Sequence, residues 1–287
     1  MKGDSTMTKK LIPMAICYDF DGTLSPGNMQ EYGFMESLGT TPAKFWLKSN
    51  AFAQENSADF NLAYMKRMIE DAHSMNVPFN KEAFCEYGKS VKLYKGVESW
   101  FKRINKYGKE HGIDVKHYII SSGLKEIIEC TSIGKYFECI FASAYIYDAN
   151  GVPCWPANVV NYTSKTQYLF RINKGCCDIN DNKKINSYVK EDDRPVPFSN
   201  MVFIGDGETD IPAMKMVKVN GGHSIAVYNS AKKGKKDKAV KLITENRVNF
   251  VANADYSAGK KLDRYIKFVI NKLENDYSII KMEKKIT

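Results

Sequence analysis

The sequence contains no apolar run long enough to cross a bilayer and no recognisable secretory leader. A membrane-spanning helix needs about 20 consecutive apolar residues, and the apolar stretch Leu11–Tyr18 is far shorter. Residues 1–10 are polar and charged, so they lack the apolar region of a signal peptide. We therefore expect a cytoplasmic protein with no membrane partner.

No CxxC pair occurs in the sequence, which argues against a zinc site or a redox-active dithiol. The seven cysteines are odd in number and scattered, and Cys176 and Cys177 are adjacent, a spacing that does not favour a structural pair. Reduced thiols are typical of cytosolic proteins. We therefore expect the cysteines of this chain to be reduced.

Aromatic residues are missing from the most basic segment, which argues against a stacking surface for single-stranded nucleic acid. This lysine cluster consists of Lys232-Lys233-Gly234-Lys235-Lys236 with Lys238 and Lys241, in a chain of formal net charge +9. A basic chain attracts anionic substrates or nucleic acid. Charge runs are most often solvated faces, however, and we expect no nucleic-acid partner.

A pair of acids directly follows the first apolar stretch. The segment Asp19-Phe20-Asp21-Gly22-Thr23-Leu24 comes after Leu11–Tyr18, a short apolar run bounded by breakers that predicts a buried strand. Ligands of open α/β sheets bind at the carboxyl ends of the strands. One carboxylate at such a place can attack an electrophile while its neighbour transfers the proton.

Three further motifs follow in a fixed order. A second apolar strand, Val115–Ile120, ends in Ser121-Ser122-Gly123, and Lys165 lies at a predicted helix start. A third strand, 201–205, leads into Asp206-Gly207-Glu208-Thr209-Asp210. Together with the first acid pair, this order resembles the four-motif signature of the haloacid dehalogenase superfamily, in its phosphatase branch, over about residues 14–256. Taken singly, each acid or serine is also an ordinary turn former or helix cap.

The resemblance implies a small soluble phosphate ester as substrate and an aspartyl-phosphate intermediate. Asp19 would be the nucleophile, and Asp21 would first protonate the leaving oxygen and then deprotonate water. The phosphoryl oxygens would be bound by hydroxyl groups and one ammonium group. These groups would come from Ser121, with Ser122 as its rival, from Thr23 and from Lys165.

The resemblance also implies a Mg²⁺ cofactor, which prefers oxygen ligands. Asp19, the main-chain carbonyl of Asp21, and Asp206 would be direct ligands. Asp210 would lie behind these ligands without touching the cation directly, or it would orient Lys165. Without a cation, these four acids would face a phosphate dianion of the same sign of charge.

Two alternatives remain open. A phosphotransferase or phosphomutase uses the same residues, because only the acceptor of the phosphoryl group differs. A non-catalytic scaffold would instead bind an anion or nucleic acid through the lysine cluster. The pattern specifies neither the alcohol that carries the phosphate nor an oligomeric state.

The alternation of strands and helices predicts an α/β fold, a Rossmann-like parallel sheet with helices on both faces. We expect a hairpin over 144–156 with a turn at 148–151. Strands are expected at about 13–19, 116–121, 138–142, 201–205, 224–227 and 248–252.

Helix-like runs fill residues 25–92, between the first two motifs, and resemble a small α-helical cap. We therefore divide the chain into a catalytic core, residues 1–24 and 93–287, and a helical cap, residues 25–92. A cap of this kind excludes water and contacts the substrate.

Overall fold

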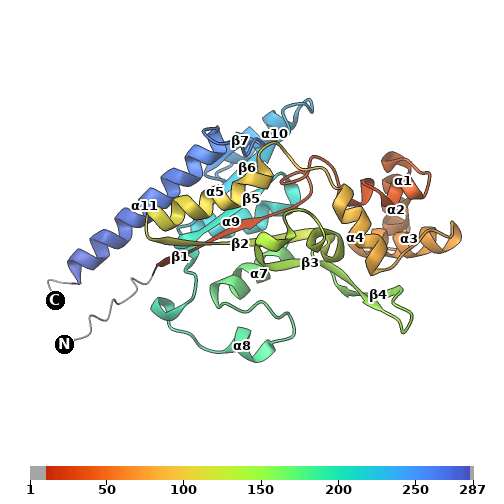
Figure 1. Ribbon diagram of the computed structural model, residues 1–287, viewed down its shortest axis with the longest axis horizontal. Helices are drawn as coiled ribbons and strands as arrows, with labels where there is room; N and C mark the ends of the chain where they lie inside the picture. The colour runs from red at the N-terminus through yellow and green to blue at the C-terminus, as the bar shows by residue number, and fades with distance from the viewer. Residues whose placement is uncertain (1–10, 285–287) are drawn as a thin grey trace, which may run out of the picture.

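The computed structural model describes residues 11–284, and within them the strands form one seven-stranded sheet. Its order is β4-β3-β2-β1-β5-β6-β7, and every neighbouring pair is parallel except β3 and β4. Figure 1 shows this sheet at the centre of the molecule. The predicted α/β fold is confirmed. The strands are β1 (Ile12–Tyr18), β2 (Ile113–Leu124), β3 (Phe137–Tyr147), β4 (Pro153–Asn158), β5 (Met201–Gly205), β6 (His223–Tyr228) and β7 (Phe250–Asn253).

The central strands are buried on both faces, which is why they read as continuous apolar runs in the sequence. All five residues of β5 are buried, as are the last five of β1. In the register of the sheet, Tyr18 at the end of β1 pairs with Ile119 of β2 and with Ile204 of β5. The residues that follow these three positions therefore meet at one edge of the sheet.

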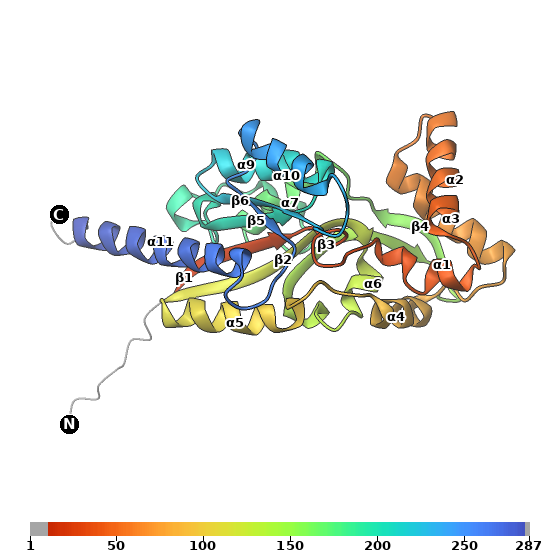
Figure 2. The ribbon, with the colours of Figure 1, turned by 90° about the horizontal axis from the view of Figure 1, so that it is seen from above.

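Helices cover both faces of the sheet, as predicted. In Figure 2, α5 (Val97–Glu110) lies on one side, and α7 (Ser164–Asn173), α9 (Ile211–Val219) and α10 (Lys235–Thr244) lie on the other. The long helix α11 (Lys261–Glu283) packs against α5 and β7. The buried residues of α5 recur at helical spacing, so that one apolar stripe faces the sheet: Val97, Trp100, Phe101 and Ile104.

The segment between β1 and β2 is helical, and we refer to residues 25–92 as the helical insertion. It contains a 3-10 turn, η1 (Met29–Glu31), and the helices α1 (Phe34–Ser37), α2 (Pro42–Glu55), α3 (Phe60–Ser74) and α4 (Lys81–Ser90). The side chains of Thr41, Asp59 and Asn80 accept hydrogen bonds from backbone N–H groups at the starts of α2, α3 and α4. Figure 1 shows the insertion gathered at one end of the sheet.

Hydrogen bonds join the insertion to the rest of the fold. The Tyr64 hydroxyl donates to the carbonyl oxygen of Ser122, within the second predicted motif, at 2.7 Å. The Tyr145 hydroxyl donates to the carbonyl oxygen of Met65 at 2.8 Å. The Asn61 amide donates to the carbonyl oxygen of Val160 at 2.9 Å. The insertion therefore contacts both β2 and the segment that follows the β3–β4 hairpin.

The predicted hairpin is present, because β3 and β4 pair antiparallel and the Asp148 N–H donates to the Val152 carbonyl oxygen. The remaining short elements are α6 (Lys125–Glu129), α8 (Asn182–Asn186), η2 (Gly134–Tyr136), η3 (Glu191–Asp193), η4 (Phe198–Asn200) and η5 (Glu208–Asp210). Among the helices of residues 11–284, none combines the length and the apolar character needed to cross a membrane.

The expectation of reduced cysteines is wrong for four of the seven. Within the described residues, Cys85 forms a disulfide with Cys130, and Cys139 forms one with Cys177. Their Cα atoms are 4.9 Å and 5.7 Å apart, within the range that a disulfide spans. The partners are 45 and 38 residues apart in sequence, so only the fold brings them together. The Cys85–Cys130 bond ties α4 of the insertion to the end of α6.

Candidate active site

Two of the predicted acids lie at the ends of neighbouring central strands. Asp19 directly follows β1, and its N–H donates to the Ile204 carbonyl oxygen at 2.9 Å. Asp206 directly follows β5, which pairs with β1. One carboxylate oxygen from each of Asp19, Asp206 and Asp210 lies within 4.8 Å of the others. Residues far apart in sequence thus form one acidic cluster at the carboxyl edge of the sheet, where ligands of such folds bind.

A buried lysine joins two of these acids. Lys165, the second residue of α7, is fully buried, and its Nζ lies 3.0 Å from Asp19 Oδ1 and 2.7 Å from Asp210 Oδ1. Burial alone would lower the pKa of Lys165, but the carboxylates of Asp19 and Asp210 raise it above its ordinary value. Burial raises the pKa of Asp210, and the Lys165 ammonium opposes that rise. The lysine is therefore a fixed positive charge inside the acidic cluster.

Asp21 is oriented by the helical insertion. Its Oδ1 accepts a hydrogen bond of 2.9 Å from the backbone N–H of Met29, at the start of η1. Burial and the neighbouring Asp19 carboxylate raise the pKa of Asp21 well above its ordinary value, and the Met29 N–H partly offsets this rise. A raised carboxyl pKa favours the protonated form, which is the form that donates a proton.

The turn that follows Asp21 needs a glycine. Gly22 has φ of +77°, in the left-handed region that favours glycine. A Cβ atom at Gly22 would also overlap the carboxylate of Asp206. The glycine therefore lets the backbone of the first motif pass directly beside the acid of the last motif.

The three predicted hydroxyl residues differ in their surroundings. Ser122 lines the cavity described below, and its Oγ is buried without a hydrogen-bond partner among the described residues. Ser121 is buried beneath it, and its Oγ accepts from the N–H of Gly123 at 3.1 Å. Thr23 is fully buried, and its Oγ1 also has no partner within residues 11–284. Of these hydroxyls, only that of Ser122 both lacks a partner among the described residues and belongs to a residue of the cavity wall, so it is available for a ligand.

A cavity of about 450 Å³ opens over the acidic cluster. Of the predicted site residues, it is lined by Asp19, Asp21, Ser122, Lys165 and Asp206. Asp210 lies behind them and reaches the cavity through Lys165. Ser121 and Thr23 are not in its wall. The structure therefore gathers most of the predicted set around one space.

The wall of this cavity also contains residues that the sequence did not single out as site residues, among them Glu31, Trp46 and Tyr64 from the insertion and Lys232 and Lys235 from the lysine cluster. The charge run of the lysine cluster predicts a solvated face instead. The position of these lysines in the sequence could have indicated their place in the wall, because they follow the predicted strand at 224–227. In the structure that strand, β6, ends at Tyr228 and pairs with β5. No comparable signal marks the insertion residues, whose local pattern is that of helix packing.

The donor set fits a hard divalent cation. The cluster offers carboxylate oxygens from three acids within a short distance, and Mg²⁺ is bound by carboxylates and water rather than by sulfur or imidazole. Burial and the Asp19 carboxylate raise the pKa of Asp206, while Lys235, whose Nζ lies 3.4 Å from Asp206 Oδ2, lowers it. A bound cation would relieve the repulsion among these acids.

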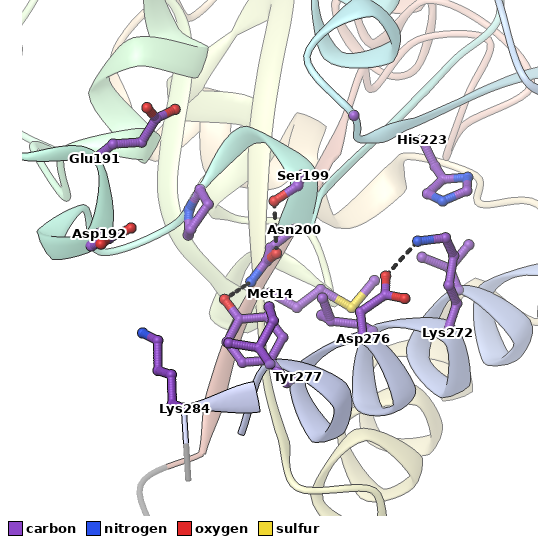
Figure 3. A pocket seen from close by; sticks show the side chains of 15 residues that line it. Met14, Glu191, Asp192, Ser199, Asn200, His223, Lys272, Asp276, Tyr277 and Lys284 are labelled. Carbon is purple, nitrogen blue, oxygen red and sulfur yellow. Dashed lines mark hydrogen bonds and ion pairs between the residues drawn. The ribbon is translucent and has the colours of Figure 1, made fainter. Parts of the chain in front are cut away.

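A second cavity, of about 510 Å³, lies beside α11 and is lined by none of the predicted site residues. Figure 3 shows that several of its polar groups pair with one another. The Asn200 amide donates to the Tyr277 hydroxyl at 3.0 Å, and Lys272 pairs with Asp276 at 2.5 Å. It contains the beginning of β1 at Met14, so it lies away from the carboxyl edge. We therefore take the cavity over the acidic cluster as the candidate active site.

Residues 16–215 match the family model of haloacid dehalogenase-like hydrolases. The match covers most of the chain and includes all four motifs. The chain belongs to this family of hydrolases.

Individual proteins are similar to this chain over most of its length. An uncharacterized protein of Borreliella burgdorferi is 28% identical over 282 residues, which cover 88% of this chain and 95% of the relative. Among solved structures, a hydrolase of the same family from Salmonella enterica serovar Typhi is 18% identical, with a TM-score of 0.55, and covers 88% of this chain and 73% of its own. A probable phosphoserine phosphatase from Vibrio cholerae is 11% identical, with a TM-score of 0.54, and covers 94% and 69%. At these identities the two structures show the shared fold.

Proposed function

We propose that this protein is a Mg²⁺-dependent phosphomonoester hydrolase that works through an aspartyl-phosphate on Asp19. The observation that carries the proposal is the fully buried Lys165 between Asp19 and Asp210, with Asp21 two residues beyond Asp19 in the same cavity wall. This arrangement offers a nucleophile, a proton donor and a fixed positive charge at one place, as phosphoryl transfer requires. The name of the Vibrio cholerae relative, a phosphatase, agrees with the proposal.

In the first step, a carboxylate oxygen of Asp19 attacks phosphorus, and the bond from phosphorus to the alcohol oxygen breaks. Asp21 donates its proton to that leaving oxygen. In the second step, Asp21 accepts a proton from water, whose oxygen attacks the same phosphorus. The bond between phosphorus and the Asp19 oxygen then breaks, and inorganic phosphate leaves.

The other residues bind and orient the phosphoryl group. Lys165 supplies positive charge to its oxygens and keeps the Asp19 carboxylate in place. The Ser122 or Ser121 hydroxyl donates a hydrogen bond, and Thr23 contributes a further hydroxyl. Asp210 holds Lys165 through the 2.7 Å ion pair, so it acts on the reaction through the lysine.

Asp19, the main-chain carbonyl of Asp21, and Asp206 would hold the cation. When bound, Mg²⁺ neutralises negative charge on the phosphoryl oxygens and lets a dianion enter a cluster of acids. We further propose that the helical insertion, residues 25–92, is the cap over this site, since it supplies one wall of the cavity and orients Asp21 through Met29. The cytoplasmic location stays a prediction.

The test is phosphate release from an aryl phosphate in Mg²⁺ and in EDTA. We expect release in Mg²⁺ that EDTA abolishes and that Asp206→Asn reduces by about 100-fold or more. Glu208→Gln is the matched control, because Glu208 lies in the same loop but is exposed. Release that is insensitive to EDTA would contradict the proposal. Transfer of phosphate to an added alcohol, with little free phosphate in water, would favour the phosphotransferase instead.

A further inference from the structure

The wall that the helical insertion gives to the active-site cavity contains a single charged residue. That residue is Glu31, and apart from Pro26 and Gly27 the other insertion residues in this wall carry amide or aromatic side chains. They include Asn28, Gln30, Trp46, Asn50, Phe60, Asn61 and Tyr64. The alcohol part of a substrate would meet this wall, because the phosphoryl group is bound by the core motifs on the opposite side.

Glu31 is fixed in place by neutral donors. Its Oε1 accepts hydrogen bonds from the Asn28 amide at 2.6 Å and from Trp46 Nε1 at 3.3 Å. Within residues 11–284, no lysine, arginine or histidine forms an ion pair with Glu31. A half-buried carboxylate that is oriented by neutral donors and forms no ion pair can accept a cationic group of a ligand.

One aromatic side chain, Trp46, contacts this carboxylate, and a second, Tyr64, lies in the same cavity wall. The Trp46 ring packs edge-on against the Tyr64 ring with centroids 5.8 Å apart. The Tyr64 hydroxyl donates to the carbonyl oxygen of Ser122, at the end of β2 that lines the cavity. A carboxylate next to aromatic faces is the combination that recognises an ammonium group, by charge and by cation–π attraction.

The insertion brings no cation to the cavity that could bind a substrate carboxylate. None of its basic side chains lines the cavity, and two of them form ion pairs within the insertion, Arg67 with Asp71 and Lys89 with Glu86. The basic residues of the cavity wall all come from the core. Lys165 is held between two acids, Lys235 lies against Asp206, and Lys232 donates to the carbonyl oxygen of Pro26 at 3.2 Å.

We propose that the substrate is a small phosphomonoester whose alcohol carries an ammonium group and no carboxylate, and that Glu31 is the residue that selects it. This inference rests on the phosphatase function proposed above. The positive charge of such a substrate compensates Glu31, and its short alkyl chain fits a cavity of about 450 Å³ that already contains the phosphate site. The class is that of the amino-alcohol phosphates.

The test compares kcat/KM for phosphoethanolamine, for glycerol 1-phosphate, which has no amine, and for phosphoserine, which adds a carboxylate. We expect phosphoethanolamine to exceed both by about 10- to 100-fold, the range for a hydrogen bond to a charged group. Glu31→Gln should remove this preference, so that kcat/KM for phosphoethanolamine falls to that for glycerol 1-phosphate in the same variant. Glu36→Gln, an exposed glutamate of α1, is the matched control and should retain the preference.

Equal kcat/KM for phosphoethanolamine and glycerol 1-phosphate, a preference for phosphoserine, or a preference that survives Glu31→Gln would each overturn the inference. If the enzyme still hydrolyses phosphate esters, any of these results contradicts only the selectivity and not the phosphatase function. Hydrolysis of no ester at all would instead contradict that function. In that case, calorimetry can compare the binding of phosphoethanolamine with that of glycerol 1-phosphate to the Asp19→Asn variant. The inference predicts tighter binding of phosphoethanolamine, and the double variant Asp19→Asn/Glu31→Gln should lose that difference.

Discussion

The ammonium nitrogen of Lys165 lies 3.0 Å from a carboxylate oxygen of Asp19, although 146 residues separate the two in sequence. Asp19 ends the central strand β1, and Lys165 begins α7, which packs on the opposite side of the sheet from α5. Both side chains are almost completely shielded from solvent. The contact therefore places a permanent positive charge at the proposed nucleophile before any substrate arrives.

Replacing Lys165 should affect both the stability of the fold and the rate of phosphate release, and a double variant should separate these two effects. Lys165→Met leaves buried carboxylates without their counter-charge, and we expect a loss of about 3–5 kcal/mol in the free energy of unfolding, measured by urea denaturation. Phosphate release should fall by about 100-fold or more. The double variant Lys165→Met/Asp210→Asn should regain part of the stability but none of the activity. Lys233→Met, an exposed lysine, is the control, and a Lys165→Met enzyme as active as that control would refute the role.

Gly22 should be essential for a reason that a matched glycine does not share. Gly22 and Gly112 both have positive φ, +77° and +73°, so alanine should cost about 1–2 kcal/mol of stability at either position. Only at Gly22 would the new methyl group overlap Asp206, whereas nothing lies within 4 Å at Gly112. We expect Gly22→Ala to abolish Mg²⁺-dependent phosphate release and Gly112→Ala to retain it. Equal activities would mean that the backbone approach to Asp206 is unimportant.

A buried histidine predicts the pH dependence of stability. Trp100 Nε1 donates to the Tyr18 hydroxyl at 2.8 Å, so that hydroxyl donates its own proton to His117 Nδ1 at 2.9 Å. His117 Nε2 then donates to Asn105 Oδ1 at 2.7 Å. This chain of bonds fits only the neutral ring, since a second proton on Nδ1 would face the Tyr18 proton. Burial accordingly lowers the pKa of His117 from 6.5 to about 3.

The direction of the pH dependence follows from the difference in the pKa of His117 between the folded and the unfolded chain. Below pH 6.5 the unfolded chain binds a proton at His117 that the folded chain does not bind until about pH 3. The free energy of unfolding should therefore decrease as the pH is lowered from 6.5 toward 3. This residue should contribute about 1.4 kcal/mol of that decrease per pH unit. His117→Gln should flatten that slope relative to the wild type in urea denaturation between pH 6.5 and 4. The exposed His73→Gln should not. Parallel slopes for the wild type and His117→Gln would contradict the assignment.

The disulfide between Cys85 and Cys130 closes a segment of 45 residues that includes the end of the insertion and the second motif. Removing a link of this span should lower the free energy of unfolding by about 2–4 kcal/mol. We expect that loss in Cys85→Ser/Cys130→Ser compared with the oxidised wild type, and equal stabilities under reducing agent. Cys154→Ser, which removes an exposed free thiol, is the control. A non-reducing peptide map with free thiols at both positions would show that the bond does not form.

The fold and the acidic cluster were predictable because each motif stands at a strand end or a helix start. Parallel strands share one carboxyl edge, which predicts that Asp19 and Asp206 lie on the same edge, and the pairing of β1 with β5 makes them neighbours. The strand ends were less predictable. β2 begins at Ile113, before the expected 116, because its first residues alternate between buried and half-buried positions rather than forming an apolar run.

The features that sequence reasoning missed depend on packing between distant elements. Trp46 reads as part of an ordinary helix core, and its hydrogen bond to Glu31 arises only from the way α2 packs against η1. The pairing of Cys139 with Cys177 likewise depends on where the segment after α7 returns to β3. Local periodicity describes which face of a helix is apolar, but not which other element that face meets.

The most direct test of the account is to trap the phosphoryl group on Asp19. In Asp21→Asn, an aryl phosphate should still react, because its leaving group needs no protonation, whereas the water that cleaves the intermediate is no longer deprotonated. After an acid quench, mass spectrometry should find one phosphoryl group on the peptide that contains Asp19, and none in Asp19→Asn/Asp21→Asn. Phosphate release by Asp19→Asn at the wild-type rate, with no label on the Asp19 peptide of Asp21→Asn, would contradict the central claim.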